Sequence, residues 1–240
     1  NEESIAKMVA FKEMKARGKR LNLEEAINIQ NTIEKVRRVF ENAQIIRNMT
    51  MGDDSTSSPA PLQKFLGLSK KPERIEGYDV AHIQGKHTVG AMVVFNNGTP
   101  DKNSYRKFKI NSSKPGDDTG ALREMFTRRL SHLEWPSPDL IIIDGGIGQL
   151  NATLTALKGI GYRDKGLVII ATTKDEHHRC KYILVASNFH TLTHKRCPLT
   201  SLPEAVKNLI LFVDAEAHRF AIGYYRSLHK REMRGRVGRQ

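Results

Sequence analysis

The segment PDLIIIDGGIGQ, residues 138–149, decides the fold of this chain. Its centre, DLIIID, is almost wholly apolar and ends in Asp144, which two glycines and the start of a helical pattern follow. A strand this apolar is covered on both faces, as the central strands of parallel sheets are. The segment therefore predicts a buried parallel strand followed by a crossover helix.

The role of Asp144 is open on this segment alone. A nucleotide-binding loop is one interpretation, but DGGIGQ matches neither GxGxxG nor GxxxxGK[ST], and its acid repels phosphate unless a metal intervenes. The structural alternative is a turn former that caps the next helix. The third interpretation is a metal ligand.

Strand and helix patterns alternate around this segment. Three strands are predicted at 74–83, 88–97 and 104–110, the last two joined as an antiparallel hairpin by NNGTPDKN. A helix (116–133), a strand (139–144), a helix (148–161), a strand (166–172), an edge strand (181–187) and a long helix (201–232) follow. An antiparallel hairpin followed by parallel strands predicts an α/β fold, a ribonuclease H-like mixed sheet flanked by helices.

The regions outside this domain have a different composition. Residues 1–47 are rich in helix formers with apolar residues at helical spacing, which predicts an α-helical hairpin that turns near Gly18. Residues 48–71 are polar and rich in Ser, Pro and Gly, as linkers are. We therefore expect a hairpin at 1–47, a linker at 48–71, the α/β domain at 72–232 and a basic tail at 233–240.

The composition limits the classes of function. The chain has 240 residues, with 39 Lys and Arg against 26 Asp and Glu, and its net charge of +13 attracts polyanions such as nucleic acid. A basic protein without a nucleic-acid partner is the alternative. With two cysteines there is no disulfide framework, so a reducing, cytoplasmic location is expected, and no apolar run is long enough for a membrane span. Because the chain begins with Asn1, we expect it to be part of a longer polypeptide.

Two aspartates are candidates for metal binding. Asp79 interrupts the first predicted strand, where a packed apolar residue is the norm, and Asp144 ends the central one. If the first and fourth strands are neighbours, both carboxylates lie at the same strand ends, close enough to share a cation. Hard oxygen ligands of this kind are preferred by Mg²⁺ and Mn²⁺.

Further candidates lie on two predicted helices. In DAEAHRFAIGYYR, His218 could be a ligand or a proton carrier, although a histidine at the edge of the core, on an otherwise solvated helix face, is the ordinary alternative. In GDDTGALRE, Asp117 and Asp118 stand where acids cap helices, so catalysis and capping are both open for Asp118.

The loop at 174–200 contains enough histidine and cysteine for a zinc site, but the spacing is not that of a zinc finger and basic residues surround it. Contact with DNA is the favoured interpretation. The residues concerned are His177, His178, Cys180, His190, His194 and Cys197.

The segments ERIEGYDVAHIQGKHTVGAMVVFNNG, GDDTGALREMFTRRL, PDLIIIDGGIGQLNATL and DAEAHRFAIGYYRSLHKR, in this order between residues 72 and 231, resemble the C-terminal endonuclease region of the UvrC family, the nuclease of excinuclease ABC. The resemblance implies a ribonuclease H-like domain that cuts DNA 5′ to a lesion with an Asp-Asp-His triad and a divalent cation. Asp79, Asp144 and His218 match that triad. Asp118 matches the second acid of the family's G-D-D motif, and Lys174 matches a family lysine.

The resemblance extends to the expected partners. LNLEEAINIQNTIEKV, residues 21–36, is similar to the UVR motif through which UvrC contacts UvrB, its partner in excinuclease ABC. Lesion-containing double-stranded DNA is the implied substrate, and Lys86, Arg123, Lys174 and Arg219 are candidate DNA-binding residues. The alternative is a module that binds DNA or a partner and keeps the nuclease fold without cutting.

The chain also departs from the family. Ile147 stands where the family's D-G-G-K-G-Q motif has lysine, so that lysine is missing or a neighbour such as Lys174 replaces it. The loop at 174–200 differs strongly. The family's GIY-YIG nuclease and tandem helix-hairpin-helix do not flank these residues, which indicates either a fragment or a reduced form.

Overall fold

The computed structural model describes residues 40–49, 58–83, 87–111, 117–159, 162, 166–175, 179–187 and 193–237. Residues 40–49 are helical, and the rest of the expected N-terminal hairpin lies outside the described residues. The same holds for the end of the basic tail, after residue 237. Of the helices that the structure describes, none has the unbroken apolar stretch that a bilayer span requires.

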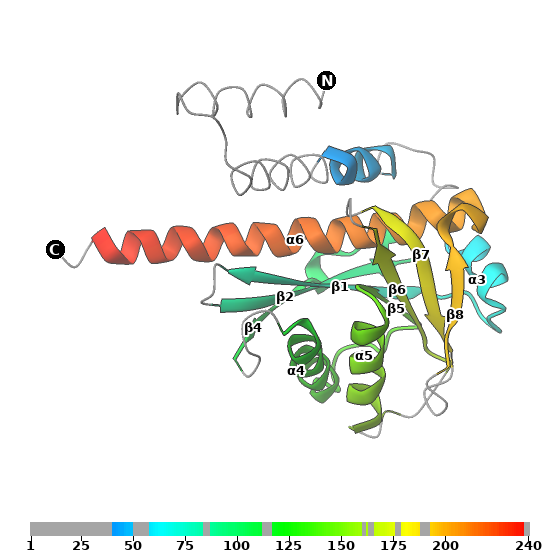
Figure 1. Ribbon diagram of the computed structural model, residues 1–240, viewed down its shortest axis with the longest axis horizontal. Coiled ribbons are helices and arrows are strands. Elements are labelled where there is room, and N and C mark those ends of the chain that lie inside the picture. The colour runs from blue at the N-terminus through cyan, green and yellow to red at the C-terminus, as the bar shows by residue number, and fades with distance from the viewer. Residues whose placement is uncertain are drawn as a thin grey trace, which may run out of the picture.

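The centre of the molecule is a mixed β-sheet (Figure 1). Its strands follow the order β3-β2-β1-β5-β6-β7-β8, with β4 also paired to β2. The pairs β1/β5 and β5/β6 are parallel, and the pairs β1/β2, β2/β4, β6/β7 and β7/β8 are antiparallel. The strands are β1 (Arg74–Ile83), β2 (His87–Asn96), β3 (Thr99–Pro100), β4 (Arg106–Ile110), β5 (Leu140–Asp144), β6 (Val168–Lys174), β7 (Cys180–Ala186) and β8 (Lys195–Pro198).

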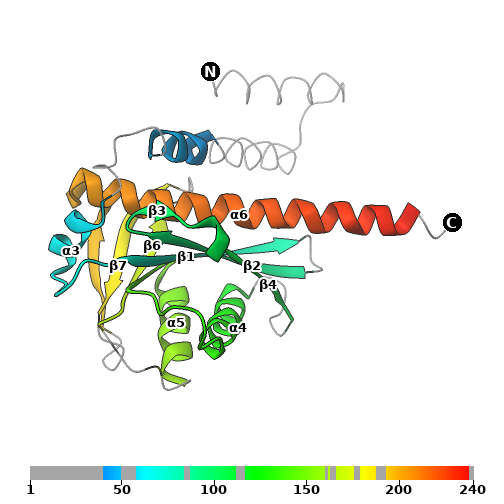
Figure 2. The same ribbon diagram turned by 180° about the vertical axis from the view of Figure 1, so that it is seen from behind.

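Helices cover both faces of this sheet. The long helix α6 (Glu204–Val237) crosses one face, while α4 (Asp118–Ser131) and α5 (Ile147–Gly159) lie on the other (Figures 1 and 2). The short helix α3 (Ala60–Leu66) lies at the end of the sheet near β8, and two 3-10 turns, η2 (Lys102–Ser104) and η3 (Leu199–Ser201), complete the described elements. The predicted mixed sheet flanked by helices is confirmed.

The central strand behaves as its sequence indicates. Leu140, Ile141, Ile142 and Ile143 of β5 are all at most 1% exposed, because parallel strands stand on both sides and helices cover both faces. The strand ends at Asp144, where the chain turns into α5. The strand–turn–helix unit predicted for residues 138–149 is therefore present.

A close approach between β1 and α6 sets the position of the long helix. A Cβ atom on Gly77 would stand only 2.5 Å from Cγ1 of Val213 and 2.9 Å from Cγ2 of Val93. Glycine at 77 thus lets α6 lie directly on β1, since any side chain there would push the helix away. The contact lies two residues before Asp79 on the strand and five residues before His218 on the helix, so it brings these two side chains together.

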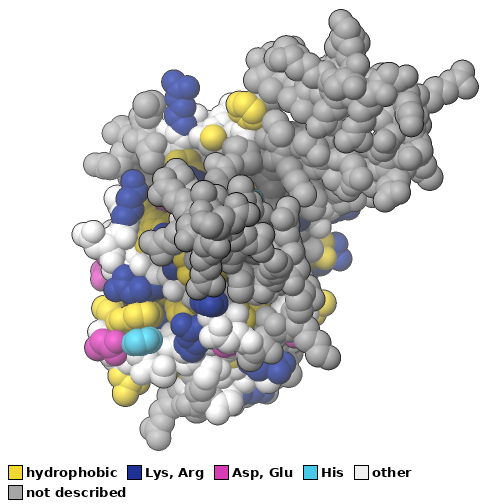
Figure 3. Space-filling view, turned by 90° about the vertical axis from the view of Figure 1, so that its left-hand side faces the viewer, with side chains coloured by type: hydrophobic (Ala, Val, Ile, Leu, Met, Phe, Trp, Pro, Cys, Tyr) yellow, Lys and Arg dark blue, Asp and Glu magenta, His cyan; other side chains and the backbone are white. Residues whose placement is uncertain are grey.

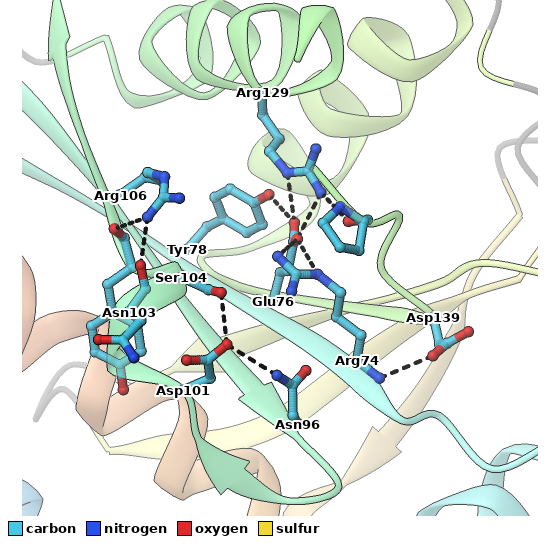
Figure 4. A network of polar contacts seen from close by, with 12 residues as sticks. Arg74, Glu76, Tyr78, Asn96, Asp101, Asn103, Ser104, Arg106, Arg129 and Asp139 are labelled. Atoms are coloured by element: carbon cyan, nitrogen blue, oxygen red, sulfur yellow. Dashed lines mark hydrogen bonds and ion pairs between the residues drawn. The ribbon is translucent and has the colours of Figure 1, made fainter. Parts of the chain in front are cut away.

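The opposite face of β1 is held by a buried ionic network (Figure 4). The carboxylate of Glu76, which is fully buried, accepts hydrogen bonds from Arg74 Nε at 2.9 Å, Arg129 Nη2 at 2.8 Å and the Tyr78 hydroxyl at 2.6 Å. Arg129 also donates to the carbonyl of Pro136 at 2.6 Å. Two guanidinium groups and a hydroxyl thus offset the cost of burying this carboxylate and tie α4 to β1.

Several elements differ from the sequence expectations. Residues 60–66, placed in the linker, form α3, which starts at a proline and buries Leu62. The strand predicted at the sheet edge, β7, is an inner strand, because β8 pairs with it. That strand was missed because KRCP has four residues, two of them charged and exposed, and ends in proline. The long helix begins at Glu204 rather than Ser201.

Candidate active site at the ends of β1, β5 and β6

Asp79 and Asp144 lie at the same end of two neighbouring strands. Tyr78 of β1 pairs with Ile143 of β5, and each aspartate is the next residue on its strand. Parallel strands are about 4.8 Å apart, so side chains level with each other and on one face lie within reach of a common ligand. Both carboxylates contact groups on the α6 side of the sheet, Asp79 with His218 and Asp144 with Lys174. The first and fourth predicted strands are neighbours, which is the condition under which these two carboxylates were expected to meet.

His218 of α6 lies against Asp79. Its Nδ1 atom is 3.3 Å from Asp79 Oδ1, and both side chains are largely buried. The second oxygen of Asp79, Oδ2, is buried and has no hydrogen-bond partner among the described residues. A buried carboxylate oxygen without a donor is costly, and a cation at this position would remove the cost. His218 is thus a partly buried histidine at the edge of the core that contacts one of the two candidate metal ligands.

Lys174, at the end of β6, joins Asp144 to a third acid. Its ammonium group is 2.6 Å from Asp144 Oδ2 and 3.1 Å from Oδ2 of Asp214, on α6. Asp214 is 8% exposed and also accepts a hydrogen bond from the Thr172 hydroxyl at 2.9 Å. Burial raises the pKa of Asp214, whereas the nearby charge of Lys174 acts in the opposite direction.

Sequence reasoning assigned no role to Asp214. The available signal was its spacing, because it precedes His218 by four residues and side chains four apart share one face of a helix. Glu216, two residues before His218, lies on a different face, but the spacing assigns Asp214 no contact without the position of α6 over the sheet. Glu216 instead accepts hydrogen bonds from Arg219 and from the Tyr105 hydroxyl.

The three expected metal ligands do not form one closed cluster. In the part of the chain that the structure describes, no group of three or more His, Cys, Asp and Glu side chains converges as a metal centre. Asp79 is paired with His218, while Asp144 is paired with the ammonium of Lys174. The structure thus places a lysine cation on one of the two carboxylates that were predicted to hold a metal.

The capping role near the start of α4 belongs to Asp117. Its carboxylate accepts from the backbone N–H of Gly120 at 2.8 Å and from the Thr119 hydroxyl at 2.7 Å, and these bonds lower its pKa. Asp118 is the first residue of the helix and is half-buried. A Cβ on Gly148 would lie 3.8 Å from Thr119 Cγ2, so this helix start stands beside the turn that follows Asp144.

The candidate DNA-binding residues occupy different places. Lys174 lies in the site, and Arg219 forms a two-armed ion pair with Glu216, with Nε and Nη2 each 2.6 Å from a carboxylate oxygen. Arg123 is exposed on α4, and Lys86 lies outside the described residues. On the face drawn in Figure 3, Lys and Arg side chains are spread over the described surface rather than gathered in one patch.

Two cavities border the site, and helix 40–49 lines both. One of about 410 Å³ is lined by Asn42, Ile45, Lys174 and Asp214, among others. The other, of about 250 Å³, is lined by Asn42, Ile46 and His218, among others. This described part of the expected N-terminal hairpin therefore lies next to the groups that face these cavities.

The cysteines give the zinc interpretation no support. Cys180 and Cys197 lie on neighbouring strands, but Ile183, not Cys180, is the partner of Cys197. Burial raises the pKa of the Cys180 thiol to about 12. His177, His178 and His190 lie outside the described residues.

Most of the chain, including the site, matches a known protein family. The model of the UvrC RNase H endonuclease domain matches residues 63–222, which include all the elements from β1 to the site-bearing half of α6. The chain belongs to this family. The ribonuclease H-like fold predicted from the strand order is thereby confirmed, and Asp79, Asp144 and His218 all lie within the matched region of this UvrC domain.

Relatives of the UvrC domain cover most of this chain. The UvrABC system protein C of Trichlorobacter lovleyi is 40% identical over 179 residues, which are 72% of this chain and 30% of that protein. The protein of the same name from Dehalococcoides mccartyi is 36% identical over 222 residues, or 88% of this chain and 33% of its own length. The chain thus spans about a third of the length of these relatives.

Solved structures of endonuclease V are more distant. A Ciona intestinalis endonuclease V in complex with an inosine-containing DNA has a TM-score of 0.43 and 12% identity, covering 87% of this chain and 100% of that chain. The enzyme from Streptomyces avermitilis has a TM-score of 0.41 and 18% identity, covering 68% and 84%. Similarity at this level says nothing about function.

Proposed function

We propose that this UvrC domain is a metal-dependent DNA endonuclease that makes the incision 5′ to a lesion in nucleotide excision repair. The observation that carries the proposal is the placement of Asp79 and Asp144 level on adjacent parallel strands, with His218 against Asp79. Its substrate is lesion-containing double-stranded DNA. Membership of the endonuclease-domain family supports the same conclusion.

The donor set fits Mg²⁺ or Mn²⁺. Asp79 and Asp144 offer hard carboxylate oxygens, and the unpartnered Oδ2 of Asp79 is a position that a cation would stabilise. These two carboxylates would hold the ion at the strand ends, and His218 stands beside them against Asp79. When bound, such an ion supplies Lewis-acid stabilisation of the charge that develops on a phosphodiester and favours attack by water.

His218 serves as the proton-handling group of the site. The Asp79 carboxylate accepts from Nδ1, which assigns the proton to that nitrogen and leaves Nε2 as the atom that exchanges a proton with an attacking or leaving oxygen. Asp118, at the start of the neighbouring helix, adds negative charge at the same end of the sheet. We propose a supporting catalytic role for it.

We propose that Lys174 makes the phosphate contact that the family lysine would make at position 147, where this chain has isoleucine. Ile147 is 45% exposed at the first residue of α5, and its apolar side chain offers nothing to a phosphate. Lys174 reaches Asp144 from the next strand, so its ammonium stands where a phosphate would approach the same carboxylate. Arg123, Arg219 and Lys86 would extend the basic surface, and the net charge of +13 supplies salt-dependent affinity for DNA.

The N-terminal hairpin is proposed to dock UvrB, the partner protein in excinuclease ABC. Its support is the similarity of residues 21–36 to the UVR motif, and those residues lie outside the described part of the structure. Helix 40–49, which follows them, borders both cavities of the site. The segment proposed to bind UvrB therefore lies close in the sequence to the helix that borders the site.

A specific observation favours a second candidate, a module that binds DNA or a partner without cutting. Lys174 forms an ion pair with Asp144, and the described residues contain no closed metal cluster. If this arrangement persisted with metal and DNA, the domain would keep the fold and bind DNA through its charge alone.

One assay separates the two candidates. The substrate is a lesion-containing duplex that already carries the 3′ nick, with UvrB and Mn²⁺, and wild type is compared with Asp144→Asn. Asp139→Asn is the matched control, since Asp139 precedes the same strand at its other end and binds Lys70 and the Arg74 backbone N–H. The endonuclease proposal expects incision by wild type and the control only. Binding of DNA and UvrB without incision by any of the three favours the second candidate.

A further inference from the structure

Asp214 is a buried acid for which the proposed reaction has no use so far. It lies one turn before His218 on α6, and its carboxylate is 3.1 Å from the ammonium of Lys174. Lys174 in turn is 2.6 Å from Asp144. Lys174 of β6 thus forms ion pairs with Asp144 of β5 and with Asp214 of α6, and so links the three elements.

The position of Asp214 is fixed by the sheet beneath it. Thr172 of β6 pairs with Asp144 of β5, and its hydroxyl lies 2.9 Å from Asp214 Oδ1. The same hydroxyl lies 3.2 Å from the carbonyl of Ile143, a longer contact to a neutral acceptor. One hydroxyl proton serves one acceptor at a time, and the charged carboxylate is the stronger acceptor. Asp214 is therefore anchored at the strand position next to Asp144.

A lysine at this place needs such an anchor. The side chain has four rotatable bonds, and holding it in one geometry costs conformational entropy. The side chain of Lys174 is only 13% exposed, and the β6/β7 register shifts at this residue, a feature that re-aims side chains near functional sites. The turn after Asp144 consists of Gly145, Gly146, Ile147 and Gly148, so it contributes no cation.

The charge balance of Asp144, Lys174 and Asp214 also gives Asp214 a role. If Lys174 had Asp144 as its only carboxylate, its ammonium would cancel the charge that attracts a divalent ion. With Asp214 present, two carboxylates share one ammonium and the group keeps a net negative charge. Asp144 can then exchange Lys174 for a metal ion while Lys174 retains a counter-ion, which avoids leaving a partly buried ammonium unpaired.

We propose that Asp214 is a positioning residue that holds Lys174 beside Asp144 and keeps its counter-ion when Asp144 takes up the catalytic cation. The inference rests on the proposed function and deepens it. Asp214 touches neither DNA nor the cation in this role. It acts through Lys174, whose ammonium then meets the incoming phosphate from a fixed position.

The test uses the whole chain with Asp214→Asn, which keeps the shape of the side chain and removes its charge. Glu216→Gln is the matched control, because Glu216 is a buried acid two residues further on α6 that pairs with Arg219 and Tyr105 instead. Two readouts do not need activity. The first is the rate at which acetic anhydride labels Lys174, followed by peptide mass spectrometry, and the second is Mn²⁺ affinity by titration calorimetry.

In Asp214→Asn we expect Lys174 to be labelled about tenfold faster, since a hydrogen bond between charged groups is worth at least this factor. We expect Mn²⁺ to bind about tenfold more weakly, as the loss of one nearby negative charge predicts. Asp214→Glu should restore part of both effects, and Glu216→Gln should show neither. Melting followed by circular dichroism establishes that each variant is folded.

A folded Asp214→Asn variant with wild-type labelling and wild-type Mn²⁺ affinity overturns the inference. If that variant does not fold, Thr172→Val takes its place, because it releases Asp214 without removing a charge, and unchanged labelling of Lys174 there has the same meaning. The proposed function is tested separately by incision. Wild type that cuts nothing, with labelling and Mn²⁺ affinity that still depend on Asp214, refutes the nuclease but keeps the positioning role.

Discussion

Asp79 and His218 form the contact around which this domain is arranged, with Nδ1 of the histidine 3.3 Å from one oxygen of the buried aspartate. They are 139 residues apart in the sequence. The contact exists because Gly77 lets α6 lie directly on β1. The second oxygen of Asp79 remains without a hydrogen-bond partner within the described residues, and this is the position at which we place the cation.

Removing the charge of Asp79 should separate cutting from binding. In Asp79→Asn we expect the rate of nicking to fall by at least about a hundredfold, because the lost carboxylate stabilises the cation that the transition state needs. Affinity for DNA should stay within about twofold, since dispersed basic residues supply it. Single-turnover nicking and fluorescence anisotropy measure the two quantities. Undiminished nicking by this variant would refute the site.

The packing of α6 on β1 should be sensitive to a single methyl group. Gly77→Ala places a Cβ 2.5 Å from Val213 Cγ1, and such overpacking costs about 1–3 kcal/mol in the free energy of unfolding. Urea denaturation measures the change. Val213→Ala in the same chain should restore part of it by making room. Gly223→Ala is the control, because a Cβ there meets nothing within 4 Å, and equal losses at both glycines would contradict this explanation.

The Glu76 network should be important for stability. Arg129→Met leaves the fully buried Glu76 with Arg74 as its remaining guanidinium partner, and breaking a buried ion pair from one side costs about 3–5 kcal/mol. The double variant Glu76→Gln with Arg129→Met removes the stranded charge and should lose less. Chemical denaturation of the three proteins checks this. A double variant that is less stable than Arg129→Met would show that the charge of Glu76 is not the cause.

Asp117 should make the start of α4 sensitive to pH. Its pKa is lowered, first by the hydrogen bond from the Gly120 backbone N–H and then by that from Thr119. An acid with a lowered folded-state pKa stabilises the protein at pH values above its unfolded pKa, and this contribution is lost as the pH falls through the folded one. Asp117→Asn should therefore lower the melting temperature at pH 7, and this difference should shrink as the pH falls through the lowered pKa of Asp117. A difference independent of pH would contradict a role for the charge.

The sequence predicted the parts of the site that depend on strand order. DLIIID is recognisable as a central strand, and an antiparallel hairpin followed by a parallel strand places β1 beside β5. Because β1 and β5 are neighbours, Asp79 and Asp144 lie level, as expected for that strand order. The helix pattern left the role of His218 open, and the resemblance to the UvrC family assigned it to the site.

The contacts of Lys174 could not be predicted in the same way. They depend on the rotation of α6 about its axis, which the Gly77–Val213 contact sets, and this decides that Asp214 rather than Glu216 meets the sheet. Helical periodicity places Asp214 on the face of His218, but it does not show which strand residues that face meets. The short strand β8 was missed for another reason, because four residues with two exposed charges do not show the alternation that identifies longer strands.

The location of Mn²⁺ tests the central claim most directly. Crystals of the wild-type chain soaked in Mn²⁺ without DNA should show one strong anomalous peak between the carboxylates of Asp79 and Asp144, at the ~2.2 Å typical of metal–oxygen bonds, with Lys174 moved from Asp144 and still bound to Asp214. One ion is expected because a neutral histidine, His218, stands where a third acid would strengthen a second position. The same soak of Asp79→Asn should show no peak. A wild-type structure with Lys174 still on Asp144 and no anomalous signal at the strand ends would contradict the account.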